Sequence, residues 1–84
     1  MQNIPKIIDA DASKPYSLKV VFDNGIKKEY DCSPLISSRP EFNLIKDKVF
    51  FKSAHVDCGG YGISWNDDID ISEYELWENG KTIS

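Results

Sequence analysis

The fold of this chain is decided by residues 56–72, which read VDCGGYGISWNDDIDIS. Apolar residues at every second position predict one strand that ends near Cys58 and another that ends at Trp65. Gly59 and Gly60 stand between these strands and predict a turn or bulge. The side chains expected on the apolar face are Ala54, Val56, Cys58, Tyr61, Ile63 and Trp65. The stretch therefore specifies a piece of architecture, although it specifies no reaction.

A short C-terminal helix is predicted directly after this stretch. Ser72 and Glu75 fit a capping box, in which the serine accepts from an early amide and the glutamate reaches back. Gly80 is suited to a left-handed cap at the end of the helix. We expect Tyr74 and Trp77 on this helix to be partly exposed, and exposed aromatics often anchor interfaces. These two residues are the candidate partner interface.

The N-terminal half predicts further strands. Residues 8–12 alternate and suggest a first strand, and residues 16–22 predict a half-buried second strand. Asn24-Gly25 then favours a tight hairpin, because both positions tolerate positive φ, and residues 26–30 form the return strand. The side chains predicted on the inner face of the second strand are Leu18, Val20 and Phe22.

The period of two is lost in the middle of the chain, where short helices are expected. Ser33 before Pro34 is typical of a helix start, residues 40–45 suggest a second helix, and Asp47 is suited to cap a third over residues 48–52. Helices of this length do not stand alone, so packing must hold them.

The order of elements predicts the α+β class: an antiparallel sheet of four to five strands, short helices packed on one face, and a short C-terminal helix. We expect a single domain over residues 1–84 with its core within residues 5–80, since a second core would bury too little apolar surface. An exposed edge of the sheet could pair with a strand of a partner.

Charge and composition exclude several classes of function. The net charge is −4 and Arg39 is the only arginine, which disfavours unaided binding to nucleic acid or to an anionic membrane. No apolar stretch is long enough to span a bilayer, and the first residues do not read as a secretion signal. We therefore expect a cytoplasmic protein in which Cys32 and Cys58 are reduced, with Cys58 a small core residue.

The candidate chemical groups are few. His55 and Cys58 invite a metal hypothesis, but the chain offers only three Cys and His residues for the four ligands of structural zinc. Asp67, Asp68 and Asp70 are the best candidates for a weak divalent-cation site, although neither register of a calcium loop places the required glycine and glutamate. The simpler interpretation of residues 67–70 is a solvated turn that precedes the N-terminal cap of the helix.

No motif of catalysis or cofactor binding stands out. The chain has no nucleophile elbow and no phosphate-binding loop, and its glycines fall between predicted strands rather than before a helix. We therefore expect no enzymatic activity and no cofactor.

Four motifs, taken in order, resemble a known bacterial family. They are Leu18-x-Val20-x-Phe22-x-Asn24-Gly25, Tyr30-Asp31 before a capped turn, Val49-Phe50 before a strand, and Gly62-Ile63-x-Trp65-x-x-x-x-Asp70-Ile71-Ser72 followed by Leu76. Over residues 5–80 the chain resembles the small proteins grouped as domain-of-unknown-function family two-four-four-two. It departs from them at residues 66–68, where relatives often carry a proline-asparagine-glycine type of turn.

The resemblance implies a stand-alone domain, sometimes joined to a helix-turn-helix domain that this chain lacks. Relatives are often encoded beside another small protein, in an arrangement that resembles toxin–antitoxin pairs. The resemblance implies no catalytic residues. Two hypotheses follow: a protein-interaction or regulatory module that binds a neighbouring protein or itself, and a small-ligand or cation-binding protein that uses the turn at residues 67–70.

Overall fold

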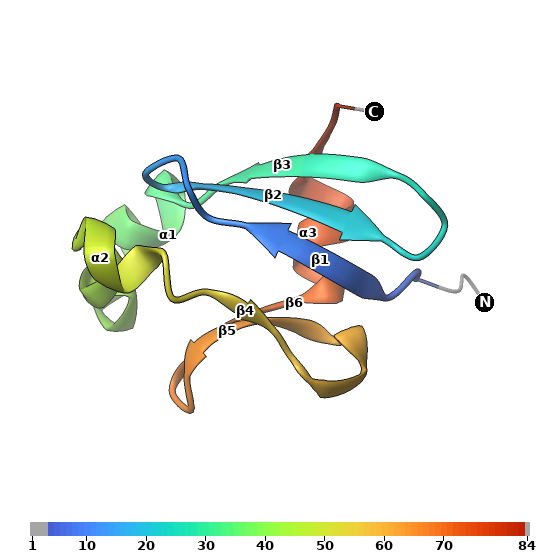
Figure 1. Ribbon diagram of the computed structural model, residues 1–84. Helices are drawn as coiled ribbons and strands as arrows, with labels where there is room; N and C mark the ends of the chain where they lie inside the picture. Colours follow the sequence, from blue (N-terminus) through green and yellow to red (C-terminus); the bar gives the residue numbers. More distant parts are fainter. Residues whose placement is uncertain (1–3, 84) are drawn as a thin grey trace.

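The computed structural model describes residues 4–83 and confirms the α+β class (Figure 1). The first sheet holds β1 (Ile7–Asp11), β2 (Ser17–Phe22), β3 (Lys27–Asp31) and β7 (Lys81–Thr82), in that order. The second sheet holds β4 (His55–Val56), β5 (Gly62–Asn66) and β6 (Ile69–Ser72). The helices are α1 (Ser33–Ser38), α2 (Lys48–Phe51) and α3 (Glu73–Asn79), with 3-10 helices η1 (Pro40–Lys46) and η2 (Cys58–Gly60).

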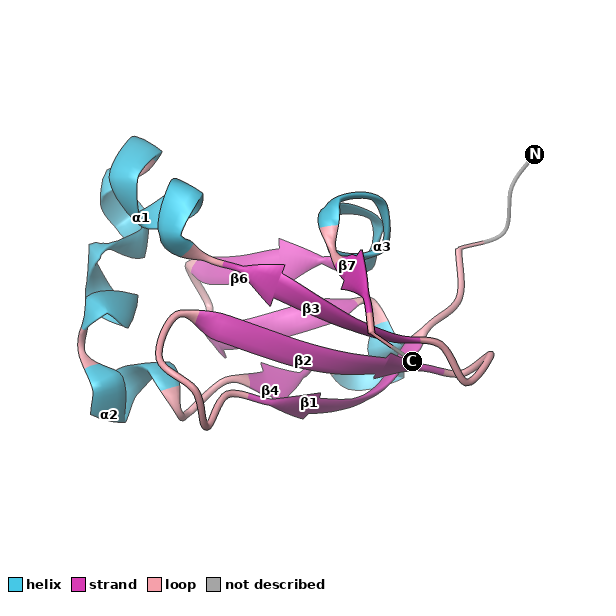
Figure 2. Cartoon of the chain, turned by 90° about the horizontal axis from the view of Figure 1, so that it is seen from above, coloured by secondary structure: helices cyan, strands magenta, loops and turns pink. Residues whose placement is uncertain are grey.

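The strands form two antiparallel sheets rather than one, and the sheets lie in two layers (Figure 1). Apolar side chains of both layers meet in one core, which includes Val20 of the first sheet and Ile63 of the second. Because each sheet covers the other, the short helices do not line one face as expected. Instead α1, η1 and α2 gather at one end, and α3 lies apart from them (Figure 2). Phe42, Ile45 and Phe51 bury the helical end against the core.

The hairpin of β2 and β3 is confirmed. Leu18, Val20 and Phe22 are fully buried on one face of β2. The turn differs in detail from the prediction: Gly25 has φ of 88° while Asn24 does not have a positive φ. Gly25 N donates to Phe22 O at 2.9 Å, and Phe22 N donates to Ile26 O at 2.9 Å. This is the three-residue type of hairpin loop, in which the glycine alone takes the left-handed conformation.

Strand β1 carries a bulge that reverses the expected alternation at its start. Ile7 pairs with Phe22, whereas Asp9 pairs with Val21, so one extra residue lies in β1. Ile7 is buried and Ile8 is turned outward, while Ala10 packs against the core. A bulge of this kind at a sheet edge bends the strand and discourages pairing with another chain.

The helices are capped by the predicted residues or by residues within a few positions of them. Asp47 Oδ1 accepts from Val49 N at 2.8 Å, as expected for the cap of α2. The start of α1 differs, because Asp31 Oδ1 accepts from Ser33 N at 2.9 Å and Ser33 is already inside the helix. At α3 the hydroxyl of Ser72 accepts from Glu75 N at 3.2 Å, which confirms half of the capping box.

The end of α3 corrects two expectations. Gly80 has φ of −74° and is therefore not a left-handed cap. A Cβ there would lie 2.4 Å from Leu76 O, so close approach explains the glycine. After Gly80 the chain adds β7, whose Glu29–Lys81 pairing to β3 was not predicted.

The second sheet confirms Ile63 and Trp65 as core residues, and Trp65 Nε1 donates to Phe51 O at 2.9 Å. Two other predictions here were wrong. Cys58 and Tyr61 are exposed, because the turn at η2 interrupts the strand pattern before β5 begins. A period of two cannot be continued through such a turn. No helix within residues 4–83 is long and apolar enough to cross a membrane.

The two cysteines are expected to differ sharply in reactivity. Cys32 is buried, and its burial raises the pKa of its thiol to about 12, whereas Cys58 is exposed. Since the thiolate is the reactive form, a thiol reagent at pH 8 should label one cysteine per chain quickly and the second only after denaturation. Cys58→Ala should abolish the fast phase and Cys32→Ala should leave it intact. Rapid labelling of the Cys58→Ala variant under native conditions would contradict the buried position of Cys32.

Candidate functional site

Hydrogen bonds to an asparagine side chain organise the acidic turn. Asn66 Oδ1 accepts from Asp68 N at 2.8 Å and from Ile69 N at 2.9 Å, which closes the loop between β5 and β6. Asp67 and Asp68 are exposed at the tip, and Asp70 lies further along on β6. Among the described residues no three His, Cys, Asp or Glu side chains come together as metal ligands. The cation hypothesis therefore has no geometric support.

Trp77 is partly exposed, as expected, and it also packs against the core. Its ring meets the Phe22 ring edge-on with centroids 5.1 Å apart. Lys28 Nζ lies 4.1 Å from the centroid of the Trp77 ring and donates to Trp77 O at 2.5 Å. This tryptophan is partly buried and joins α3 to the first sheet, so it has a structural role. On the same helix Tyr74 is 57% exposed, in agreement with the expectation for that residue.

A second exposed aromatic lies beside the start of α3. Tyr61 is 59% exposed, and its carbonyl accepts from Glu73 N at 3.0 Å. Lys6 Nζ lies 3.3 Å from Glu73 Oε2 and 4.4 Å from the centroid of the Tyr61 ring. Lys6 thus links Tyr61 to Glu73, and Tyr74 is the next residue on the helix. We call Lys6, Tyr61, Glu73 and Tyr74 the α3 face.

The α3 face was only half predicted. Sequence reasoning found Tyr74 but placed Tyr61 in the core and did not single out Lys6. Lys6 and Glu73 are 67 positions apart, so no local pattern could pair them. The pair Gly59-Gly60 before Tyr61 was the one sequence signal that could have indicated an interrupted strand and an exposed Tyr61.

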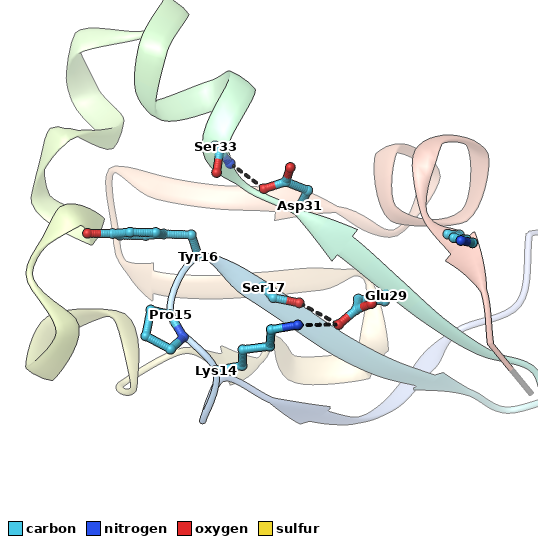
Figure 3. Close-up of a pocket in the computed structure, with 8 residues that line it drawn as sticks. Lys14, Pro15, Tyr16, Ser17, Glu29, Asp31 and Ser33 are labelled. Carbon is cyan, nitrogen blue, oxygen red and sulfur yellow. Dashed lines mark hydrogen bonds and ion pairs between the residues drawn. The ribbon is translucent and has the colours of Figure 1, made fainter.

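A polar cleft of about 390 Å³ lies at the end of β2 and β3, next to α1 (Figure 3). Tyr16 stands at its rim and is the one non-glycine residue of positive φ, 64°, within residues 4–83. It follows Pro15 in a turn that Ser17 N closes on Lys14 O at 3.1 Å, a position where glycine is usual. Such backbone strain costs roughly 1–3 kcal/mol and needs compensation elsewhere.

The compensation is structural. The Tyr16 hydroxyl donates to Lys46 O at 2.9 Å, and its ring contacts Phe51 edge-on at 6.2 Å between centroids. Figure 3 shows the ring directed away from Lys14 and Ser17, toward the helical segment. Tyr16 therefore holds the helical end against the sheets. These contacts account for the positive φ of Tyr16 without a ligand.

The charged groups of the cleft bind one another. Ser17 Oγ donates to Glu29 Oε2 at 2.8 Å, and Lys14 Nζ lies 4.0 Å from the same oxygen (Figure 3). Asp31 is engaged by the amide of Ser33. Each of these two carboxylates is thus held by local donors.

A second, smaller cavity of about 200 Å³ lies between α1, α3 and the outer edge of β6. Its lining residues are Leu35, Arg39, Phe42, Asp70, Ile71, Ser72 and Glu75. Next to it the Tyr30 hydroxyl donates to Glu75 Oε2 at 2.8 Å, and burial together with this bond raises the pKa of Tyr30. Glu75 therefore holds Tyr30 instead of completing the capping box.

The chain thus forms a small α+β domain of two layered sheets with a helical end. What distinguishes it is its exposed surface at the α3 face. The chain belongs to the family described as protein of unknown function (DUF2442), whose model matches residues 7–82. This confirms the family resemblance. No curated protein and no solved structure matches the chain.

Proposed function

We propose that this protein is a non-enzymatic interaction or regulatory module of the cytoplasm that binds a partner protein through the α3 face. The observation that carries the proposal is the exposure of two tyrosines near Glu73, Tyr61 at 59% and Tyr74 at 57%: the Tyr61 carbonyl accepts from Glu73 N, and Tyr74 follows Glu73 in the chain. Tyrosine combines a large apolar ring with a polar tip, and it is enriched among the residues that dominate binding energy.

The charge of the chain favours a basic partner. A net charge of −4 speeds encounter with a positively charged protein and disfavours association between two copies. The first candidates are the proteins encoded next to this one, because the family resemblance implies such neighbours in toxin–antitoxin-like pairs. Self-association of the chain, instead of binding to a neighbouring protein, would contradict this choice of partner.

Replacing Tyr74 with serine tests the α3 face. The substitution removes an exposed ring, so the fold should be unaffected while binding to a co-expressed neighbour weakens at least about tenfold. Affinity is measured by calorimetry with the purified neighbour, and the fold by thermal unfolding.

Val49→Ser is the matched control, because Val49 is 81% exposed and lies on α2 at the helical end. It should leave the affinity within about twofold of the parent value. Equal effects of Tyr74→Ser and Val49→Ser would show that the α3 face is not the binding surface.

A further inference from the structure

The outer edge of β6 carries backbone groups that the second sheet does not use. Strand β6 ends the order β4-β5-β6, so only β5 pairs with it. Glu73 N donates to Tyr61 O, and Ile71 pairs with Ile63. Because backbone groups alternate in direction along a strand, Asp70 and Ser72 turn their N–H groups away from β5. Within residues 4–83 no turn or side-chain hydrogen bond engages these two amides.

This edge opens into the cavity of about 200 Å³ between α1 and α3. The exposed lining of the cavity is mostly polar, with carboxylates from Asp70 and Glu75, and Leu35 with the buried Phe42 forms a smaller apolar wall. Arg39 is the one cationic residue of the lining, so two carboxylates against one guanidinium leave the groove net negative. A free strand edge, an apolar wall and negative charge thus occur together.

We propose that the edge of β6 docks an extended segment of a basic partner protein, which adds a strand to the second sheet by pairing with Asp70 and Ser72. The inference rests on the proposed interaction function and names the site and chemistry of the segment. A residue opposite Asp70 gains from positive charge, and its neighbours point toward the apolar side formed by Leu35 and Phe42. The segment therefore alternates basic and apolar residues.

Charge separates this occupant from a second copy of the chain. Two β6 edges brought together would place Asp70 and Glu75 of one copy near the same residues of the other, and like charges at close range destabilise such a pair. The remaining edges are less suitable. Strand β1 carries the bulge at Ile8 with acidic residues beside it, and β4 and β7 span only two residues each.

The test uses a capped peptide, Lys-Val-Lys-Val-Lys, and its glutamate counterpart, Glu-Val-Glu-Val-Glu. Amide hydrogen exchange of the full chain is followed by NMR with each peptide at millimolar concentration. The lysine peptide should slow exchange at Asp70 and Ser72, while Ile71, which already faces β5, should change little. The glutamate peptide should leave all three amides unchanged.

Two substitutions with the same charge change separate the groove from the acidic turn. Asp70→Asn should weaken binding of the lysine peptide by about two- to fivefold. Asp67→Asn lies in the neighbouring turn outside the groove and should leave the affinity unchanged. Equal weakening by both variants would reduce the effect to general electrostatic attraction and overturn the proposed site.

Failure of this inference is distinguishable from failure of the proposed function. Unprotected Asp70 and Ser72 amides with the lysine peptide overturn strand addition at β6, even where Tyr74→Ser weakens binding to the neighbouring protein as expected. If the peptide protects both amides while no neighbour binds the α3 face, the β6 site stands and the proposed role of Tyr74 falls.

Discussion

Replacing Phe51 with alanine is expected to lower the free energy of unfolding by about 3–5 kcal/mol. Phe51 is 1% exposed, and its ring lies between Tyr16 and Trp65 with centroid distances of 6.2 and 5.8 Å. Its carbonyl also accepts the Trp65 indole N–H. One side chain thus joins the helical end to the second sheet and to the strained turn at Tyr16.

The size of this effect is large relative to the whole domain. A chain of 84 residues is expected to be stable by about 4–13 kcal/mol, so the Phe51→Ala variant should lose a large share of its stability. Urea unfolding followed by tryptophan fluorescence measures the change. Val49→Ala on the same helix is the control, because Val49 is exposed and its truncation should change stability by less than about 0.5 kcal/mol. Equal losses for the two variants would contradict the placement of α2.

Gly60→Ala is expected to destabilise the fold by about 2–5 kcal/mol. Gly60 has φ of 77°, and a Cβ at this position would lie 2.5 Å from Ile7 O and 3.0 Å from Ile7 N. Because these are backbone atoms of β1, the clash can be relieved only if the first sheet moves away from η2. The substitution therefore tests the contact between the two layers.

Gly25→Ala provides the matched comparison for Gly60. Gly25 has φ of 88°, but no atom lies within 4 Å of a Cβ there. Its replacement carries the conformational penalty alone, about 1–2 kcal/mol. The difference in midpoint of urea unfolding between the two variants isolates the clash with β1. Identical midpoints would show that η2 does not lie against Ile7.

Local signals account for the parts of the fold that could be predicted. The β2–β3 hairpin follows from a clean alternation and from Gly25, and the α2 cap follows from Asp47. The burial of Trp65 follows from an apolar face within one strand. Each of these features depends on residues within a few positions of one another, which is the range in which sequence patterns are informative.

Non-local pairing explains the errors. The split into two sheets depends on how the layers meet in the core, and β7 contains only Lys81 and Thr82, too few residues to show a period. The bulge at Ile8 is set by the register with β2. Sequence patterns do not encode such distant partners, so these features emerge only in the folded chain.

In the candidate site, too, local patterns predicted some residues correctly, and contacts between distant residues explain the errors. The exposure of Tyr74 was predicted from its position on a short terminal helix. Trp77, three residues further on, is partly buried because Phe22 and Lys28 of the first sheet cover it. Tyr61 was assigned to the core because the strand pattern was continued through η2.

This chain is proposed to bind a basic partner through the α3 face. The most direct measurement is the molar mass, by light scattering after size exclusion, of the protein co-expressed with each protein encoded beside it. We expect one stoichiometric complex, heavier than the 9.5 kDa chain by the mass of the partner, whose share of the eluted protein falls in the Tyr74→Ser variant. Elution of the chain alone at 9.5 kDa with every neighbour would contradict it.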